Sequence, residues 1–418
     1  MNKNQKTFID LISFSIKGQK ATAEQLADID WQEMILLAQR HSVLPLLFTA
    51  LSLETVGKNL YASLKNYVYL QILDQDKRIK ILQSVLAAFA NENMPIIVLK
   101  GLALKNLYPI PSARIMGDFD LLVRQMDMDK GIQLLVGLGF KMVDYGHLVH
   151  VVMSLNDSII IELHKHLFDS VKYNLPQDYL KNVWLDADAS QYGSNVCQLS
   201  NDDTILYLIL HLYKHYEEGG FGIRQLCDIA LFMEKKQNGI DWDRLYSLSL
   251  KLGILRFTYL IFNICGNLFG IKIPDAFLKG TMISKEQLQL FIDEIVAGGV
   301  FGVANRYHKA KSKIMETMDY QDYQGVRKII ALRKLLFPDM RNLKDRYTYA
   351  RQYPVLLPAA WLHRLLFVSF NTERRSQLIA YLAHKDTEIT EEMKESKKLL
   401  YWIMEERHQK TRRAKNAG

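Results

Sequence analysis

Three carboxylates spaced for chemistry lie between residues 118 and 162. Asp118 and Asp120 are separated by one residue, in the run RIMGDFDLLV over residues 114–123. Because side chains alternate along an extended segment, both carboxylates leave one face and the apolar side chains leave the other. Two carboxylates this close repel each other in a partly dry site unless a cation or a proton sits between them. Oxygen ligands favour a hard divalent cation, Mg²⁺ or Mn²⁺.

The third carboxylate, Glu162, is the lone acid in the apolar run SIIIELH over residues 158–164. Its β-branched residues predict a strand, and strand parity places Glu162 and His164 on one face. An acid buried in a strand needs a partner, and a metal held by Asp118 and Asp120 would supply one. Glu162 is also our candidate, by face, to accept a proton during the reaction.

A basic motif precedes the carboxylates. The apolar residues 95–99 end at Lys100 and Gly101, which predicts a buried strand that opens into a helix. Gly101 allows close backbone approach, and the helix start offers free N–H groups to a phosphate. Lys100, Lys105 and Arg114 could each bind phosphate or balance nearby acids.

The order of these motifs resembles the uncharacterised bacterial nucleotidyltransferases of the polymerase-β-like superfamily. The motifs that carry the resemblance are Lys100-Gly101, Leu107-Tyr108-Pro109, residues 114–123 and residues 161–164. Helical segments on both sides resemble the family too: Asp30-Trp31 with residues 36–43, and residues 211–215, 224–230 and 240–242. The chain has Gly101-Leu102 where the wider superfamily usually has Gly-Ser, so a serine that would touch phosphate is absent.

The resemblance implies an α+β fold, with a small mixed β-sheet nucleotidyltransferase core and extensive N- and C-terminal helical segments. It implies transfer of a nucleoside monophosphate from a nucleoside triphosphate, ATP among them, to an acceptor hydroxyl with release of pyrophosphate. The acceptor could be a small molecule, sugar, peptide, protein or RNA. The implied roles are catalysis and Mg²⁺ or Mn²⁺ binding by Asp118, Asp120 and Glu162; nucleotide binding by Lys100, Gly101, Lys105, Arg114 and His164; and substrate orientation by Arg224 and Asp228.

Simpler interpretations compete at several of these positions. Arg224 and Asp228 are four residues apart on a predicted helix and could form an exposed ion pair. The segment 298–302 is glycine-rich, as in a phosphate loop, but a helix end followed by a turn explains it more simply. Four histidines raise the alternative of a zinc site, without a helical His-x-x-x-His or a cysteine partner among them to support it: His147, His150, His164 and His166. We expect His164 to support the metal ligands or face a phosphate.

Helical periodicity dominates outside the predicted core. We expect a helical segment over 1–92, the nucleotidyltransferase core over 93–175, a helical domain over 176–300 and a basic, mostly helical region over 301–418. Within the core, Asp127 is a candidate cap for a helix that ends near Gly137. Residues 148–153 and the Glu162 strand predict a hairpin around Asn156-Asp157.

Composition points to a cytoplasmic enzyme. The three cysteines are widely spaced and odd in number, which argues against a disulfide framework, and the polar, basic start has no cleavage pattern. Between Arg306 and Arg351, twelve Lys or Arg face five Asp or Glu, a net of +7 in a chain of formal charge +8. This region and the apolar stretch after it, together 306–370, could contact a polyanion or the inner membrane surface. The simpler interpretation of this region is a solvated helical face followed by a core helix. The alternative to the transferase function is a catalytically weak relative that acts as a nucleotide-, polyanion- or membrane-surface-binding module.

Overall fold

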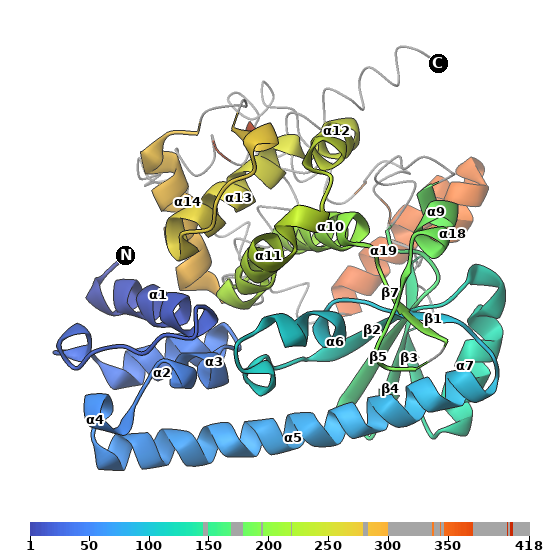
Figure 1. Cartoon of the computed structure of the whole chain (residues 1–418). Coiled ribbons are helices and arrows are strands. Elements are labelled where there is room, and N and C mark those ends of the chain that lie inside the picture. The colour runs from blue at the N-terminus through green and yellow to red at the C-terminus, as the bar shows by residue number, and fades with distance from the viewer. Residues whose placement is uncertain are drawn as a thin grey trace.

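The computed structural model describes residues 1–144, 149–168, 179–193, 195–218, 220–278, 283–299 and 347–370, with positions 337, 343, 399, 402 and 403 (Figure 1). It shows the expected mixed α+β architecture, in which the described residues form one seven-stranded mixed sheet flanked by helices. Most of the predicted basic region, including 300–336, lies outside the described residues.

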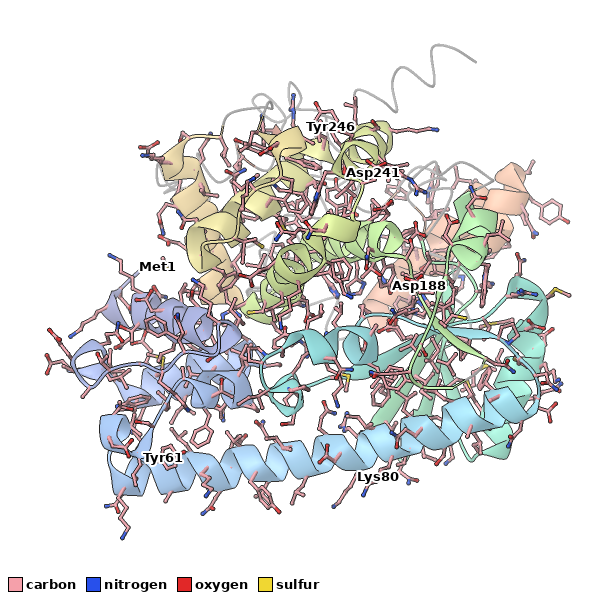
Figure 2. The ribbon with its side chains drawn as sticks, in the orientation of Figure 1. Met1, Tyr61, Lys80, Asp188, Asp241 and Tyr246 are labelled. Atoms are coloured by element: carbon pink, nitrogen blue, oxygen red, sulfur yellow. The ribbon has the colours of Figure 1, made fainter. Side chains whose placement is uncertain are left out.

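The N-terminal segment is helical, as predicted. Its helices are α1 (Lys3–Ile16), α2 (Trp31–Arg40), α3 (Leu44–Thr49), α4 (Leu53–Val56) and α5 (Lys58–Asn91). Asn2 forms a capping box at the start of α1, and the Asp30 carboxylate accepts from two backbone N–H groups of α2. Helix α5 runs from the other N-terminal helices to the far side of the sheet (Figure 1), and Lys80 lies on its outer side (Figure 2).

The sheet has the strand order β3-β4-β5-β2-β1-β7-β6. The strands are β1 (Ile96–Val98), β2 (Asp118–Leu122), β3 (Lys141–Asp144), β4 (His150–Leu155), β5 (Ile159–His164), β6 (Asp188–Ala189) and β7 (Val196–Gln198). Strands β4 and β5 form the predicted hairpin, because Asn156 and Asp157 adopt φ of 52° and 54°, a left-handed conformation that these residue types tolerate. Strand β2 is parallel to β5 and antiparallel to β1.

Helices α5 and α7 (Met128–Gly137) cover the apolar face of the sheet. Phe119, Leu121 and Leu163 pack there with Leu82 and Phe89 of α5 in one hydrophobic cluster. At Gly131 of α7 a Cβ atom would lie 3.2 Å from Leu163 Cδ2, so this glycine lets the helix approach the sheet closely. The predicted helix therefore exists and ends at Gly137 as expected, although the Asp127 side chain makes no capping hydrogen bond.

Helices of the second half lie on the opposite side of the sheet from α5 (Figure 1). They are α9 (Tyr179–Leu185), α10 (Asn201–Glu218), α11 (Ile223–Lys236), α12 (Trp242–Leu252), α13 (Leu255–Phe269) and α14 (Lys285–Gly298). Ser200 caps α10, since its hydroxyl accepts from the Asp203 N–H. One hydrophobic cluster joins α1–α3 to α10–α14 and includes Ile97 and Leu122 from the sheet. The predicted boundaries at 92 and 176 thus separate segments that share a core.

The remaining described elements lie nearer the C-terminus. Helices α18 (Thr348–Gln352) and α19 (Leu357–Phe370) meet around Tyr347, Ala350 and Ala360. Helix α14 ends at Gly298, and Gly299 follows with φ of 87°, which supports the helix-end interpretation of this glycine-rich segment as far as residue 299. Within the described residues, no helix is long and apolar enough to cross a membrane.

Candidate active site

The three predicted carboxylates converge on one face of the sheet. Parallel pairing of β2 with β5 sets Asp120 opposite Glu162, and Asp118 lies two residues before Asp120 on the same face. One oxygen of each carboxylate lies within 4.8 Å of the other two. Asp120 is 3% exposed, whereas Asp118 and Glu162 are partly open to solvent. The arrangement follows from strand parity, which the sequence predicts for both segments, and from the parallel register of β2 with β5.

Lys100 is the cation of this cluster. It caps the short helix α6 (Gly101–Leu104) at the end of β1, and its Nζ lies 2.8 Å from Asp120 Oδ1 with only 11% of the side chain exposed. The Lys100 backbone has φ of 41°, a conformation that costs a non-glycine residue about 1 kcal/mol or more. Surrounding contacts therefore hold the ammonium against the carboxylates at some backbone strain.

Charge differs among the three acids. Repulsion from Asp120, reinforced by burial, raises the pKa of Asp118 above its usual value. Burial opposes ionisation of Asp120, but Lys100 and the hydrogen bond from His164 outweigh it and lower the pKa of Asp120. The same balance, with His164 and Lys100 outweighing burial, places the pKa of Glu162 well below its usual range. Asp118 is therefore the carboxylate whose repulsion by Asp120 is not offset by the neighbouring positive charges.

A pair of histidines on α10 extends the cluster beyond Lys100. His211 Nε2 lies 3.2 Å from Lys100 Nζ and 2.7 Å from His215 Nε2. Since an ammonium only donates, a hydrogen bond from Lys100 requires His211 Nε2 to be the unprotonated nitrogen, and its single lone pair is then shared with the Nε2–H of His215. Burial, with the charge of Lys100, lowers the pKa of His211 well below its usual value and that of His215 to about 4. Both rings are therefore neutral at pH 7.

These two histidines were not among the predicted site residues. Their spacing of four residues, His211-x-x-x-His215, puts both rings on one face of α10 and is the signal that could have identified them. Tyr207, one turn before His211 on the same helix, was also missed. Its buried hydroxyl has no hydrogen-bond partner among the described residues, and its ring stacks on His211 at 5.9 Å. Burial and the three carboxylates raise the pKa of Tyr207.

His164 lies among the carboxylates, as expected for a residue that supports them. Its Nε2 is 3.2 Å from Asp120 Oδ1 and 3.4 Å from Glu162 Oε2. His150 faces His164 across the hairpin, with its Nδ1 3.7 Å from Glu162 Oε2. Burial opposes protonation of His164, but hydrogen bonds to Asp120 and Glu162 outweigh it and raise its pKa. Of the other histidines considered, His147 lies outside the described residues and His166 is not in this group.

Arg114 and Asp228 form a buried ion pair with each other. Arg114 Nε and Nη2 donate to the two Asp228 oxygens at 2.7 Å, and the Tyr108 hydroxyl donates to Asp228 Oδ1 at 2.7 Å. The alternative of an exposed Arg224–Asp228 pair is wrong, because Asp228 is only 5% exposed and its partner is Arg114. The pair ties the loop before β2 to helix α11.

The remaining predicted residues surround this loop. Arg224 Nη1 donates to the Ile115 carbonyl at 2.9 Å, two residues before Gly117. Gly101 lies against Met116, where a Cβ atom would come 2.8 Å from the sulfur. Lys105 follows α6, is half-buried and makes no ion pair within the described part of the chain. Arg224 and Gly101 thus position the segment that leads into Asp118, whereas Lys105 lies apart from the carboxylates' contacts.

A hard cation fits the carboxylate cluster. The Asp118 carboxylate has no hydrogen bond or ion pair with any described residue, although Asp120 raises its pKa. Lys100 is the only lysine or arginine in ion-pair contact with these three carboxylates in the described ranges, and it neutralises one of three negative charges. Oxygen donors from three carboxylates are the ligands that Mg²⁺ and Mn²⁺ prefer.

The fold and the cluster are those of a nucleotidyltransferase-like core, a sheet with acids on neighbouring strands and helices around it. A family model described as an uncharacterised nucleotidyltransferase matches residues 27–270, more than half of the 418 residues, and the chain belongs to this family. The matched range contains the seven described strands and every site residue described above. No curated protein and no solved structure matches the chain.

Proposed function

We propose that the protein transfers a nucleoside monophosphate from a nucleoside triphosphate to an acceptor hydroxyl and releases pyrophosphate, with Mg²⁺ or Mn²⁺ as cofactor. The observation that carries this proposal is the approach of Asp118, Asp120 and Glu162 to within 4.8 Å of one another on paired strands. Membership of a nucleotidyltransferase family supports the class of reaction. In the reaction, the acceptor oxygen bonds to the α-phosphorus as the bond to the pyrophosphate oxygen breaks.

Asp118, Asp120 and Glu162 would hold the metal. When bound, the ion neutralises phosphate charge and lowers the pKa of the attacking hydroxyl. Glu162 is our candidate to accept the proton that leaves the acceptor, because it lies opposite Asp120 on the face that carries the other carboxylates. The protein otherwise contributes by placing charges and holding reactants in line.

Lys100 is the strongest candidate for a phosphate contact. Its ammonium has three N–H donors, of which one is directed to Asp120 and one to His211, so one is left for a phosphate oxygen. His164 also faces the carboxylates and would lie near the triphosphate. Gly101 and Lys105 follow Lys100 and complete the proposed nucleotide-binding set with Arg114. Arg114 would act through the loop that Asp228 holds, and Arg224 and Asp228 would orient the substrate in the same indirect way.

One contact favours the alternative of a catalytically weak, nucleotide-binding relative. Lys100 Nζ and His164 Nε2 both contact the same oxygen, Asp120 Oδ1, which a metal would also use. If these groups permanently replaced the metal, the chain would bind a nucleotide and not transfer it. The two functions differ in whether Mg²⁺ increases nucleotide affinity.

A surface contact with a polyanion or membrane would be compatible with either function. Helix α19 exposes Leu362 and Leu366 at 61% and 51%, and it follows the segment 306–351 with its net charge of +7. We propose a cytoplasmic location with peripheral contact at the inner membrane surface through 306–370. Flotation of the full chain with anionic and neutral vesicles tests this contact.

The transfer itself is tested by incubating the full chain with each α-labelled nucleoside triphosphate, Mg²⁺ and acceptors of each class. We expect one nucleotide to give pyrophosphate and an acceptor whose mass rises by the nucleoside monophosphate. Asp118→Asn should abolish both products. Asp76→Asn, which changes an exposed acid on α5, is the matched control and should retain them. Binding of nucleotide without Mg²⁺ dependence and without product would support the alternative.

A further inference from the structure

We propose that His150, Glu162 and His164 form a second metal site, for a transition metal ion of the zinc type. One ligand atom from each of these residues lies within 4.8 Å of the other two. The group shares Glu162 with the carboxylate cluster and adds two imidazoles that are not among the ligands of the carboxylate metal site. The inference goes beyond nucleotide transfer and does not depend on it.

The hairpin builds this group from strand geometry alone. His150 on β4 is directly opposite His164 on β5, and Val152 is opposite Glu162. His164 and Glu162 are two residues apart on β5 and so share a face, and His150 as the partner of His164 projects to that face. The two imidazole rings lie 4.8 Å apart between centroids. Short, antiparallel strands thus hold three ligand side chains in fixed register.

The distances match the ligand shell of a small four-coordinate ion. Bonds of 2.0–2.1 Å in a tetrahedron place neighbouring ligand atoms about 3.4 Å apart. Glu162 Oε2 lies 3.4 Å from His164 Nε2 and 3.7 Å from His150 Nδ1. A common centre for these atoms therefore requires shifts of a few tenths of an ångström at most on these two edges.

The chemical types of the three ligands indicate which metal ion would bind. Two imidazoles and one carboxylate are ligands that zinc and its neighbours accept readily, whereas Mg²⁺ prefers oxygen. Three protein ligands leave one position for a water or a substrate oxygen, as in catalytic zinc sites and unlike closed structural ones. His150 and His164 are both buried, at 6% and 5% exposed, so the ion would lie inside the site. Glu162 has two carboxylate oxygens and can contribute to both metal sites.

The competing account needs no ion. A protonated His164 could hold Asp120 and Glu162 together through its Nε2, with His150 as a neighbour. The two accounts differ in one respect that can be measured. A ring nitrogen that carries a proton cannot bind a metal, so a cation that binds through His164 Nε2 must displace that proton.

Cobalt binding to the full chain separates the accounts. Metal-free protein is titrated with Co²⁺ in excess Mg²⁺, which occupies the carboxylate site, and the visible spectrum is recorded. We expect the intense absorption of four-coordinate Co²⁺ in the wild type and in Asp118→Asn, and at least about tenfold weaker binding in His150→Gln. His363→Gln, which removes an exposed histidine on α19, should match the wild type.

A spectrum typical of six-coordinate Co²⁺ that persists in His150→Gln and is lost in Asp118→Asn would overturn the proposal. Thermal unfolding covers the case in which His150→Gln folds poorly. Zn²⁺ with excess Mg²⁺ should raise the melting temperature of the wild type and of His363→Gln but not that of His150→Gln, and equal rises in all three would contradict the site. None of these measurements contains a nucleotide, so the proposed transfer reaction can fail while this site stands.

Discussion

The two faces of the central sheet put the same strands to opposite uses. Toward α5 and α7, residues such as Phe119 and Leu121 pack in a continuous apolar cluster. Toward α10, the alternate residues Asp118 and Asp120 meet Lys100 and the histidines. Alternation along β2 thus separates packing from chemistry by a single residue.

Stability and reactivity therefore depend on opposite faces of the sheet. Apolar burial stabilises the strands in proportion to the area removed from water. The opposite face concentrates like charges, and the raised pKa of Asp118 records the repulsion. We infer that the α5–α7 face supports a polar face that would not be stable alone.

The largest expected effect comes from the two aspartates, which should agree in activity and differ in stability. Asp118→Asn and Asp120→Asn should each reduce transfer by at least about a hundredfold. Asp118→Asn should keep or raise the melting temperature, because repulsion is relieved. Asp120→Asn should lower stability by about 3 kcal/mol, because the buried Lys100 ammonium loses its partner. Turnover and thermal unfolding measure both, and equal shifts in melting temperature would contradict the charge assignment.

On the apolar face, a substitution should reduce stability strongly and activity little. Phe89 of α5 is fully buried, so Phe89→Ala should cost about 3–5 kcal/mol of unfolding free energy. Transfer per folded molecule should stay close to that of the wild type. Chemical denaturation and an active-fraction assay give the two quantities. Tyr69→Ala, on the same helix but 59% exposed, is the control and should change little; a large loss of specific activity in Phe89→Ala would show that the faces are not independent.

The helical core contains a buried histidine, His41, that should make stability depend on pH. Its Nε2 contacts the Val296 carbonyl at 3.0 Å and its Nδ1 accepts from the Ile223 N–H at 3.1 Å. Burial lowers the pKa of His41 to about 4, against about 6.5 in the unfolded chain. Between these values the unfolded state binds the extra proton, so the unfolding free energy should fall by about 3 kcal/mol as pH drops from about 6.5 to about 4.

The pH dependence of denaturant unfolding measures this fall. His41→Gln should start from lower stability and show a flatter profile over the same range. His211 and His215 also have lowered pKa values and act in the same direction, so the difference between the two profiles is the quantity to compare. Profiles of equal slope would mean that His41 is not the acid-sensitive group.

The smallest effect should come from the outer surface of the apolar layer. Lys130 on α7 lies 2.9 Å from Glu92, but the two side chains are 52% and 47% exposed. Solvent screens such a pair, so Lys130→Ala should change the unfolding free energy by less than about 1 kcal/mol. Denaturant titration at low and high salt checks this value. A larger, salt-sensitive loss would show that surface charge supports the apolar face.

The local sequence pattern predicted the features that depend on the alternation of side chains along a strand and on short turns. The hairpin at Asn156-Asp157, the buried strand before Lys100 and the shared face of Asp118 and Asp120 follow from neighbours in sequence. The approach of Glu162 to Asp120 needed the register of two strands 42 residues apart, and family resemblance supplied the expectation.

Contacts that join distant segments could not be predicted. Arg114 and Asp228 are separated by 114 residues, and Lys100 and His211 by 111. Helical spacing relates Asp228 to Arg224 but says nothing of a residue approaching from another element, so the predicted exposed pair was wrong. The shared core of α1–α3 and α10–α14 was not predicted for the same reason, because the apolar face of a helix does not indicate which other helix it packs against.

The Arg114–Asp228 pair also sets an order of events for a chain emerging from a ribosome. Synthesis is vectorial, and Arg114 in the loop that leads into Asp118 acquires its buried counter-ion only after residue 228 is available, more than a hundred residues later. Until then the carboxylate that accepts hydrogen bonds from Arg114 and Tyr108 has not been synthesised. Contacts between residues so far apart in the sequence also form slowly. Asp118 and Asp120 are therefore synthesised well before the contacts that position them can form, and the site is complete only after helix α11 has docked.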